Sequence, residues 1–243
     1  MAPRTEAQKE KAREKAKAER QANRQARMKA ERAAGRARGL KLGYAKGAID
    51  VLSRFLTPED RVIDCGANLG DITAPLAETG AQIVCFEPDP HCFERLQTRF
   101  ADVSNVSLKN KAVYVENGTM SFSRHKAFGE KDFNTQAGTL VHGNKNVDYA
   151  PDAAIEVEVI DFTQWLADDI AANGPISVLK MDIEGAEVAL LPAMLEAGLF
   201  DQIKLSLIET HENQFPELAA DTAAIKAQIS ARYPANKVCL DWI

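Results

Sequence analysis

Four acidic residues end predicted buried strands, and a histidine lies just beyond the last of them. They are Asp64, Glu87, Asp182 and Glu209, with His211 two residues further on. In an open α/β sheet, ligands bind outside the carboxyl ends of the strands, so we expect these side chains to gather at one edge. An imidazole beside carboxylates is suited to removing a proton near neutral pH. The sequence therefore predicts proton-transfer chemistry at that edge.

The segment 61–70 predicts a loop that binds a nucleoside. A buried strand leads into a turn framed by Gly66 and Gly70, and a helix follows. Glycine lets the backbone approach a ligand closely and supplies positive φ where the turn needs it. The next strand, 81–86, ends in Glu87, which is placed to accept hydrogen bonds from ribose hydroxyls. This order indicates a nucleoside-binding βαβ unit.

The glycine spacing bears on which nucleoside is bound. A dinucleotide site uses Gly-x-Gly-x-x-Gly, because the pyrophosphate sits against bare backbone. Here Asn68 lies between Gly66 and Gly70, and Asp64 would repel a pyrophosphate but would pair with an ammonium group. S-adenosylmethionine carries an ammonium, a sulfonium and a ribose, and no phosphate. The segment favours S-adenosylmethionine over a dinucleotide; a structural turn that binds no ligand is the other alternative.

Strands alternate with helices along the chain, which predicts an α/β fold with a doubly wound, mostly parallel sheet. The strands are expected at 61–64, 81–86, 106–113, 155–160, 176–181, 203–208 and 237–242, with a short β element at 119–123. The helices are expected at 44–56, 71–79 and 217–232, and after Asp89–Pro90, Asp161 and Glu187.

Residues 124–153 interrupt this alternation. They contain three glycines, one proline and three aromatic residues. A long loop inside a compact domain is usually functional or disordered. We favour a lid or substrate-binding insert over plain disorder.

The charge is distributed unevenly. Residues 1–39 hold 13 Lys and Arg against 5 Glu, and the remainder holds 17 against 30, a balance of −13. The first segment predicts a charged arm, helical or disordered, and residues 40–243 predict the globular domain. The arm is interpreted as solvated; contact with RNA, DNA or an anionic membrane is the alternative, although the arm has no aromatic residue for base stacking.

Composition excludes other classes of protein. No apolar run is long enough to span a bilayer, and the N-terminus lacks the apolar core of a secretory signal. The four cysteines show no Cys-x-x-Cys spacing, so we expect reduced thiols, no zinc site and a cytoplasmic location.

Four motifs together resemble the FkbM family of S-adenosylmethionine-dependent methyltransferases, over about residues 60–212. They are Asp64-x-Gly66-Ala67-Asn68-x-Gly70, Phe86-Glu87-Pro88, Lys180-x-Asp182-Ile183-Glu184-Gly185-Ala186-Glu187 and Glu209-x-His211. The resemblance implies a class I methyltransferase fold and O-methylation of hydroxyls on sugars, glycolipids or polyketide-type metabolites. It also implies that Asp64, Gly66, Asn68 and Gly70 contact the methionyl end of the cofactor and that Glu87 contacts the ribose. We predict Ala67, Pro88 and Asp182 as further cofactor-binding residues.

Such sheets usually carry a seventh strand, antiparallel beside the sixth, and the sequence up to Ile243 shows no candidate for it. An oligomer is therefore left open, and the basic arm is not part of the family pattern.

Methyl transfer to an alcohol requires an aligned acceptor oxygen and removal of its proton. We predict His211 as the general base, oriented by Asp182 or Glu209. The rival hypothesis is that Asp182, Glu184 and Glu209 hold Mg²⁺, which lowers the pKa of the acceptor. A third interpretation is that Glu184 and Glu187 only favour a helix N-terminus.

The predicted acceptor is a small molecule or a glycan. A nucleic-acid methyltransferase anchored by the arm is the alternative, but the sequence contains neither Pro-Pro nor Pro-Cys, and the acidic domain would repel a phosphate backbone. A non-catalytic binding protein and a nicotinamide oxidoreductase are disfavoured by the strand-end acids and by the glycine spacing.

Overall fold

The computed structural model describes residues 24, 28–29, 35–36, 39–40 and 42–242. Residues 47–242 form one compact unit, and residues 1–46 belong to another. The predicted charged arm, 1–39, lies outside the described residues except at those few positions, so the arm stays a prediction. The architecture below is that of residues 47–242.

The central sheet has six parallel strands in the order β3-β2-β1-β7-β8-β9. They are β1 (Arg61–Cys65), β2 (Gln82–Phe86), β3 (Val106–Lys109), β7 (Ile176–Met181), β8 (Ile203–Ile208) and β9 (Val238–Cys239). The order reverses between β1 and β7, and such a switch point opens a crevice at the carboxyl ends of the two strands. The predicted doubly wound parallel sheet is confirmed.

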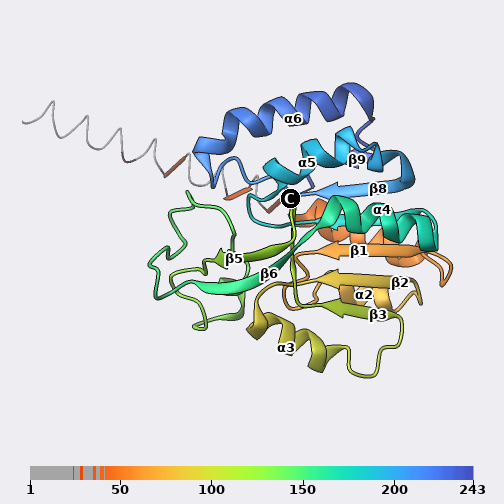
Figure 1. Ribbon diagram of the computed structural model, residues 1–243, viewed down its shortest axis with the longest axis horizontal. Helices are drawn as coiled ribbons and strands as arrows, with labels where there is room; N and C mark the ends of the chain where they lie inside the picture. Colours follow the sequence, from red (N-terminus) through yellow and green to blue (C-terminus); the bar gives the residue numbers. More distant parts are fainter. Residues whose placement is uncertain (1–23, 25–27, 30–34, 37–38, 41, 243) are drawn as a thin grey trace, which may run out of the picture. The chain divides into compact units, whose positions relative to one another are not determined.

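Helices cover both faces of this sheet, as Figure 1 shows for α4 in front and α2 behind. They are α2 (Thr73–Ala77), α3 (Pro90–Arg99), α4 (Phe162–Asn173), α5 (Glu187–Glu196) and α6 (Ala219–Arg232), and residues 47–55 are also helical. Two predicted helix starts are confirmed. The Asp89 carboxylate accepts a hydrogen bond from His91 N, and that of Asp161 accepts one from Gln164 N.

A second sheet contains the short β element expected at 119–123, the strand expected at 155–160 and the last part of the strand expected at 106–113. It has the order β4-β6-β5, with β4 (Ala112–Tyr114) parallel and β5 (Gly118–Phe122) antiparallel to β6 (Ile155–Asp161). The prediction of one strand over 106–113 is therefore wrong. The Asn110 side chain donates to the carbonyl oxygens of Glu87 and Pro88, which turns the chain at the end of β3.

Two further boundaries differ from the prediction. The last strand has two residues instead of 237–242, and the helix predicted over 71–79 spans Thr73–Ala77. Among the strands that the structure describes in the central sheet, none is antiparallel.

The core lies between the sheet and α4, α5 and α6. Strand β7 is buried at all six positions, as expected for a central strand with helices on both faces. The rings of Phe86, Phe162 and Trp165 pack together, with centroids 4.8 to 5.8 Å apart. Three of the cysteines, Cys65, Cys85 and Cys92, are buried, and all four are free thiols as predicted. In the part of the chain that is described, no helix has the length and apolar character needed to cross a membrane.

Leu179 tests the central position of β7, because its side chain is fully buried. We expect Leu179→Ala to lower the free energy of unfolding by about 2–5 kcal/mol, since the deletion leaves a cavity. Val51→Ala, at an exposed helical position, should change it by about 0.5 kcal/mol or less. Urea denaturation followed by circular dichroism measures both, and equal effects would contradict the assignment of the core.

Candidate active site

The four acidic residues expected at strand ends, Asp64, Glu87, Asp182 and Glu209, lie at the carboxyl ends of β1, β2, β7 and β8. The segment 124–153 lies on the same side of the sheet. In Figure 1 the arrowheads of β1, β2 and β8 point toward β5 and the green loops, and β7 runs parallel to β1 and β8. The site has two parts: a glycine loop after β1 and a cluster of acids around His211 after β7 and β8.

The glycine loop is held between β2 and β7. The backbone N–H groups of Gly66 and Ala67 both donate to the carbonyl of Phe86, at 2.9 and 3.0 Å. Gly66 has φ of +79°, and a Cβ atom there would lie 1.9 Å from the carbonyl oxygen of Asp182. Only glycine fits this position, because both the backbone conformation and the space exclude a side chain. Gly70 also has positive φ and faces the ring of Phe100.

Asp64 supports this loop from inside the protein. Its side chain is fully buried, accepts a hydrogen bond from Thr73 Oγ1 at 2.7 Å, and lies 3.2 Å from Lys180 Nζ. Lys180 in turn donates to the carbonyl of Gly66 at 2.7 Å. In this conformation the Asp64 carboxylate is buried and pairs with Lys180. The predicted contact between Asp64 and the ammonium group of a cofactor therefore stays a prediction.

Lys180 is a site residue to which the sequence reasoning assigned no role. Its one local signal is a lysine inside the segment 176–181, whose other residues are apolar apart from Ser177. A buried lysine is rare unless it is paired. The pairing of Asp64 with Lys180 across β1 and β7 supplies that partner.

Glu87 contacts the glycine loop from the end of β2. One carboxylate oxygen accepts from Asn68 N at 2.8 Å and the other from Asp89 N at 2.9 Å. Burial raises the pKa of Glu87 to about 7, against the opposing effect of these hydrogen bonds. Asn68 adopts φ of +49°, and Pro88 follows Glu87 directly after the end of β2. Glu87 thus lies against the glycine loop, where a ribose is expected.

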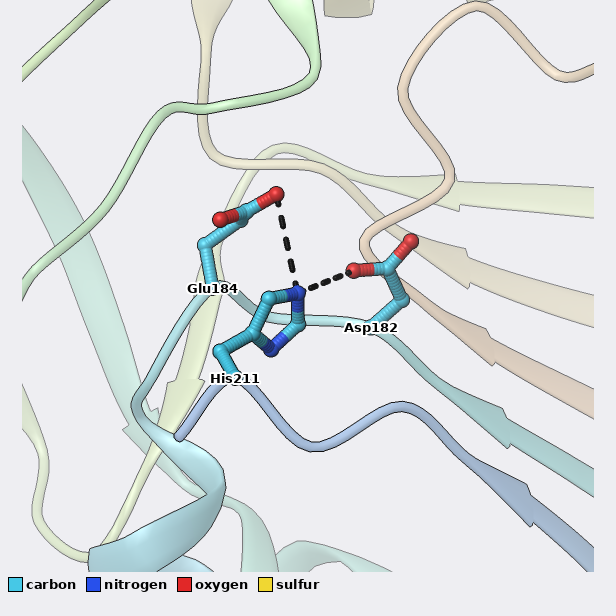
Figure 2. A group of neighbouring side chains, drawn as sticks. All are labelled: Asp182, Glu184 and His211. Atoms are coloured by element: carbon cyan, nitrogen blue, oxygen red, sulfur yellow. Dashed lines mark ion pairs between the residues drawn. The ribbon is translucent and has the colours of Figure 1, made fainter. Parts of the chain in front are cut away.

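The second part of the site is centred on the imidazole of His211, whose side chain is 1% exposed. Figure 2 shows Nε2 turned toward two carboxylates: Asp182 Oδ1 lies 3.4 Å away and Glu184 Oε1 3.6 Å away. Glu209 Oε1 lies 3.8 Å from the same nitrogen. The structure therefore brings together the three predicted catalytic residues, and adds Glu184.

The group that faces the other ring nitrogen is Glu187, not Asp182 or Glu209. Glu187 Oε1 lies 3.1 Å from His211 Nδ1. The Glu187 carboxylate is itself fixed by the backbone N–H groups of Ile183 and Gly185, at 2.9 and 2.8 Å. Asp182 and Glu209 face Nε2 instead, so the expectation that one of them orients the ring stays a prediction. The contact with Nδ1 gives Glu187 a role besides that of the first residue of α5.

The carboxylates set the protonation of this cluster. Burial by itself would lower the pKa of His211, but Glu187, Asp182 and Glu184 outweigh it and raise the pKa well above its usual value. Burial raises the pKa of Glu184 to about 8 and that of Glu209 to about 7. Burial would also raise the pKa of Asp182, but Lys180 and His211 lower it. The carboxylates therefore favour the protonated form of His211.

The segment 124–153 is tied to both parts of the site. Thr135 Oγ1 donates to Asn68 Oδ1 at 2.8 Å, and Thr139 Oγ1 donates to the carbonyl of Glu184 at 2.6 Å. These hydrogen bonds hold the segment 124–153 against the glycine loop and the acidic cluster. The role of this segment as a lid or substrate-binding insert stays a prediction.

A family model described as the methyltransferase FkbM domain matches residues 64–232, which is more than half of the chain. The chain belongs to this FkbM family. The match includes both parts of the site, from Asp64 to His211, and the resemblance expected from the motifs is confirmed.

Relatives of known name cover different shares of this FkbM chain. The 2-O-methyltransferase NoeI of Sinorhizobium fredii is 24% identical over 193 residues, which is 76% of this chain and 79% of that protein. Ribosomal RNA small subunit methyltransferase A of Thermotoga maritima is 43% identical over 54 residues, or 22% of this chain. The chain covers 19% of the length of that relative. Among solved structures, a putative rRNA methylase from Clostridium thermocellum matches 76% of this chain and 79% of that one, at 9% identity and a TM-score of 0.39.

The buried Glu87 makes the stability of the protein depend on pH. The pKa of Glu87 rises from 4.5 to about 7 on folding, so between these values the folded state binds more protons than the unfolded state. The free energy of unfolding must therefore fall as the pH rises through this window. We expect Glu87→Gln to remove a fall on the order of 3 kcal/mol between about pH 5 and about pH 8, measured by urea denaturation. Glu94→Gln, on the exposed side of α3, should keep the wild-type profile, and an unchanged profile in Glu87→Gln would contradict the assignment.

Glu184 occupies a strained backbone conformation, with φ of +52°. Such a residue costs about 1–3 kcal/mol unless it is glycine. We expect Glu184→Gly to be about 1 kcal/mol more stable than Glu184→Gln, because both lose the charge but only glycine relieves the strain. Urea denaturation of the two variants measures the difference, and a less stable glycine variant would show that the position is not strained.

Proposed function

We propose that this FkbM-family chain transfers the methyl group of S-adenosylmethionine to a hydroxyl of a sugar, a glycolipid or a secondary metabolite. The observation that carries the proposal is the position of Asp182. Its carbonyl oxygen lies against Gly66 of the nucleoside loop, and its carboxylate lies 3.4 Å from His211. A group that handles protons is thereby placed next to the loop that would hold the methyl donor.

The residues around the loop fit the cofactor. Gly66, Ala67, Asn68 and Gly70 would line the methionyl end, with Asp64 beneath them. Glu87 and Pro88 would bind the ribose, and Asp182 would lie near the sulfonium. Bound S-adenosylmethionine supplies an electrophilic methyl group on a sulfonium.

Removal of the acceptor proton is assigned to the cluster of Asp182, Glu209 and His211. The surrounding carboxylates raise the pKa of His211, so they oppose the loss of the proton that must leave before His211 can act as a base. Glu209, with a pKa of about 7, is the carboxylate matched to neutral pH. A hydroxyl acceptor fits a site of this kind, since an alcohol must lose its proton during methyl transfer.

The similarity to NoeI, which is named a 2-O-methyltransferase and covers 76% of this chain, supports an O-methyltransferase. The ribosomal RNA relative matches over 22% of the chain, and the residues after position 39 carry a balance of −13, which would repel an RNA backbone. A sugar-type acceptor is therefore favoured over RNA. The cytoplasmic location expected from the free cysteines stays a prediction.

Calorimetric titration tests the cofactor. We expect the full chain to bind S-adenosylmethionine and not NAD, and Gly66→Ala to abolish this binding because its Cβ would displace the loop. Gly118→Ala is the matched control, since a Cβ there meets no atom within 4 Å. Binding of NAD alone, or tight binding of S-adenosylmethionine by Gly66→Ala, would overturn the assignment.

Incubation with S-adenosylmethionine labelled in its methyl group, together with sugar, glycolipid and RNA fractions, tests the acceptor class. Label is expected in a hydroxyl of the sugar or glycolipid fraction, and to be lost in His211→Ala while cofactor binding persists. Label that enters RNA would overturn the acceptor class. Full turnover by His211→Ala would remove His211 from the reaction.

A further inference from the structure

The acidic cluster and the loop beneath it contain more negative than positive groups. Five carboxylates lie within 3.9 Å of the side-chain nitrogens of Lys180 or His211: Asp64, Asp182, Glu184, Glu187 and Glu209. Among the described residues, the ion pairs of these five carboxylates involve two basic side chains, Lys180 and His211. When all are ionised, three negative charges are left over. Buried carboxylates in such excess require protons or a cation.

We propose that Asp182, Glu184 and His211 bind a divalent transition-metal cation. Each offers one ligand atom, and the three atoms lie within 4.8 Å of one another. His211 Nε2 is 3.4 Å from Asp182 Oδ1 and 3.6 Å from Glu184 Oε1. Two ligands each about 2.1 Å from one ion lie about 3–3.5 Å apart when they are neighbours. A small closing movement would bring these atoms to coordination distance.

The environment of His211 is an independent sign of a ligand. The side chain is 1% exposed and points into the cluster, and Nε2, the nitrogen that faces Asp182 and Glu184, is buried without a hydrogen bond. Glu184 Oε2 is also buried without a hydrogen bond. Buried polar atoms normally have partners. A cation between Nε2 and the two carboxylates would supply one (Figure 2).

Glu187 completes the arrangement from the other side of the ring. Histidines that bind metals usually turn their second nitrogen toward a carboxylate or a carbonyl, which fixes the ring. Glu187 Oε1 lies 3.1 Å from Nδ1, and two backbone N–H groups hold that carboxylate in place. Glu187 is thus a positioning residue for the proposed ligand.

The ligand set indicates which ion is bound. The all-oxygen set expected from the sequence, Asp182, Glu184 and Glu209, would suit Mg²⁺. An imidazole in place of Glu209 favours Mn²⁺, Co²⁺, Fe²⁺ or Zn²⁺. Three protein ligands also leave open positions for oxygens of a substrate.

The following step rests on the proposed function. An open position of the ion would hold the acceptor hydroxyl, and the ion would lower the pKa of that hydroxyl. The bond from the acceptor oxygen to the methyl carbon forms, and the bond from carbon to sulfur breaks with its electron pair left on sulfur. The acceptor proton passes to Glu209, which lies 3.8 Å from Nε2 and outside the three ligands. His211 is then a metal ligand and not the base.

Titration of the full chain with Mn²⁺, after dialysis against a chelator, tests the site through the electron paramagnetic resonance of free Mn²⁺. We expect one tight site per chain. Glu187→Gln should weaken it by about 10- to 100-fold, and Glu184→Gln, which removes a direct ligand, should weaken it at least as much. Co²⁺ should show absorption bands that are lost in His211→Gln. Glu158→Gln, paired with Lys111 on the second sheet, is the matched control. Circular dichroism verifies that each variant is folded.

The wild-type chain failing to bind Mn²⁺, Co²⁺ or Zn²⁺ would overturn the site, and so would Glu184→Gln binding Mn²⁺ as the wild type does. Methyl transfer at the full rate by the chelated protein would also overturn the metal site, but it would leave the proposed function intact. Conversely, tight Mn²⁺ binding without any binding of S-adenosylmethionine would support the site and remove the function.

Discussion

The buried ion pair between Asp64 and Lys180 is the interaction on which the site depends. It joins the two strands at which the order of the sheet reverses, and Lys180 also holds the carbonyl of Gly66. Removal of one partner of a buried ion pair costs about 3–5 kcal/mol, because the remaining charge is left uncompensated. Since Gly66 rests against the carbonyl of Asp182, the pair also sets the spacing between the glycine loop and the acidic cluster.

The arrangement of side chains around His211 lowers the stability of the folded protein. Four carboxylates crowd one imidazole, Glu184 adopts a strained conformation, and several buried polar atoms lack hydrogen bonds. Strain and unpaired polar groups of this kind persist in proteins mainly where function requires them. The surrounding structure can hold this arrangement because β7 is buried at every position and Glu187 clamps the turn that follows it.

Much of the fold could be predicted because its signals are local. Apolar runs that end in an acid identified β1, β2, β7 and β8, and Asp89 and Asp161 marked two helix starts. The prediction over 106–113 was wrong because the break at Asn110 depends on hydrogen bonds to Glu87 and Pro88, more than twenty residues away. The sequence pattern there is compatible with a single strand, and no local signal reveals the change of sheet.

The sequence by itself determined which side chains stand at the strand ends, since the periodicity of apolar residues sets where each strand stops. It also located the glycine loop after β1, since the positions of the two glycines and the strand-end acids are visible in the chain. Only the tertiary structure decided that Lys180 pairs with Asp64, and that Glu187 faces Nδ1 of His211 while Asp182 and Glu184 face Nε2. The reason is physical: these contacts depend on strand register and side-chain direction between residues far apart in the chain, and periodicity carries no information about either.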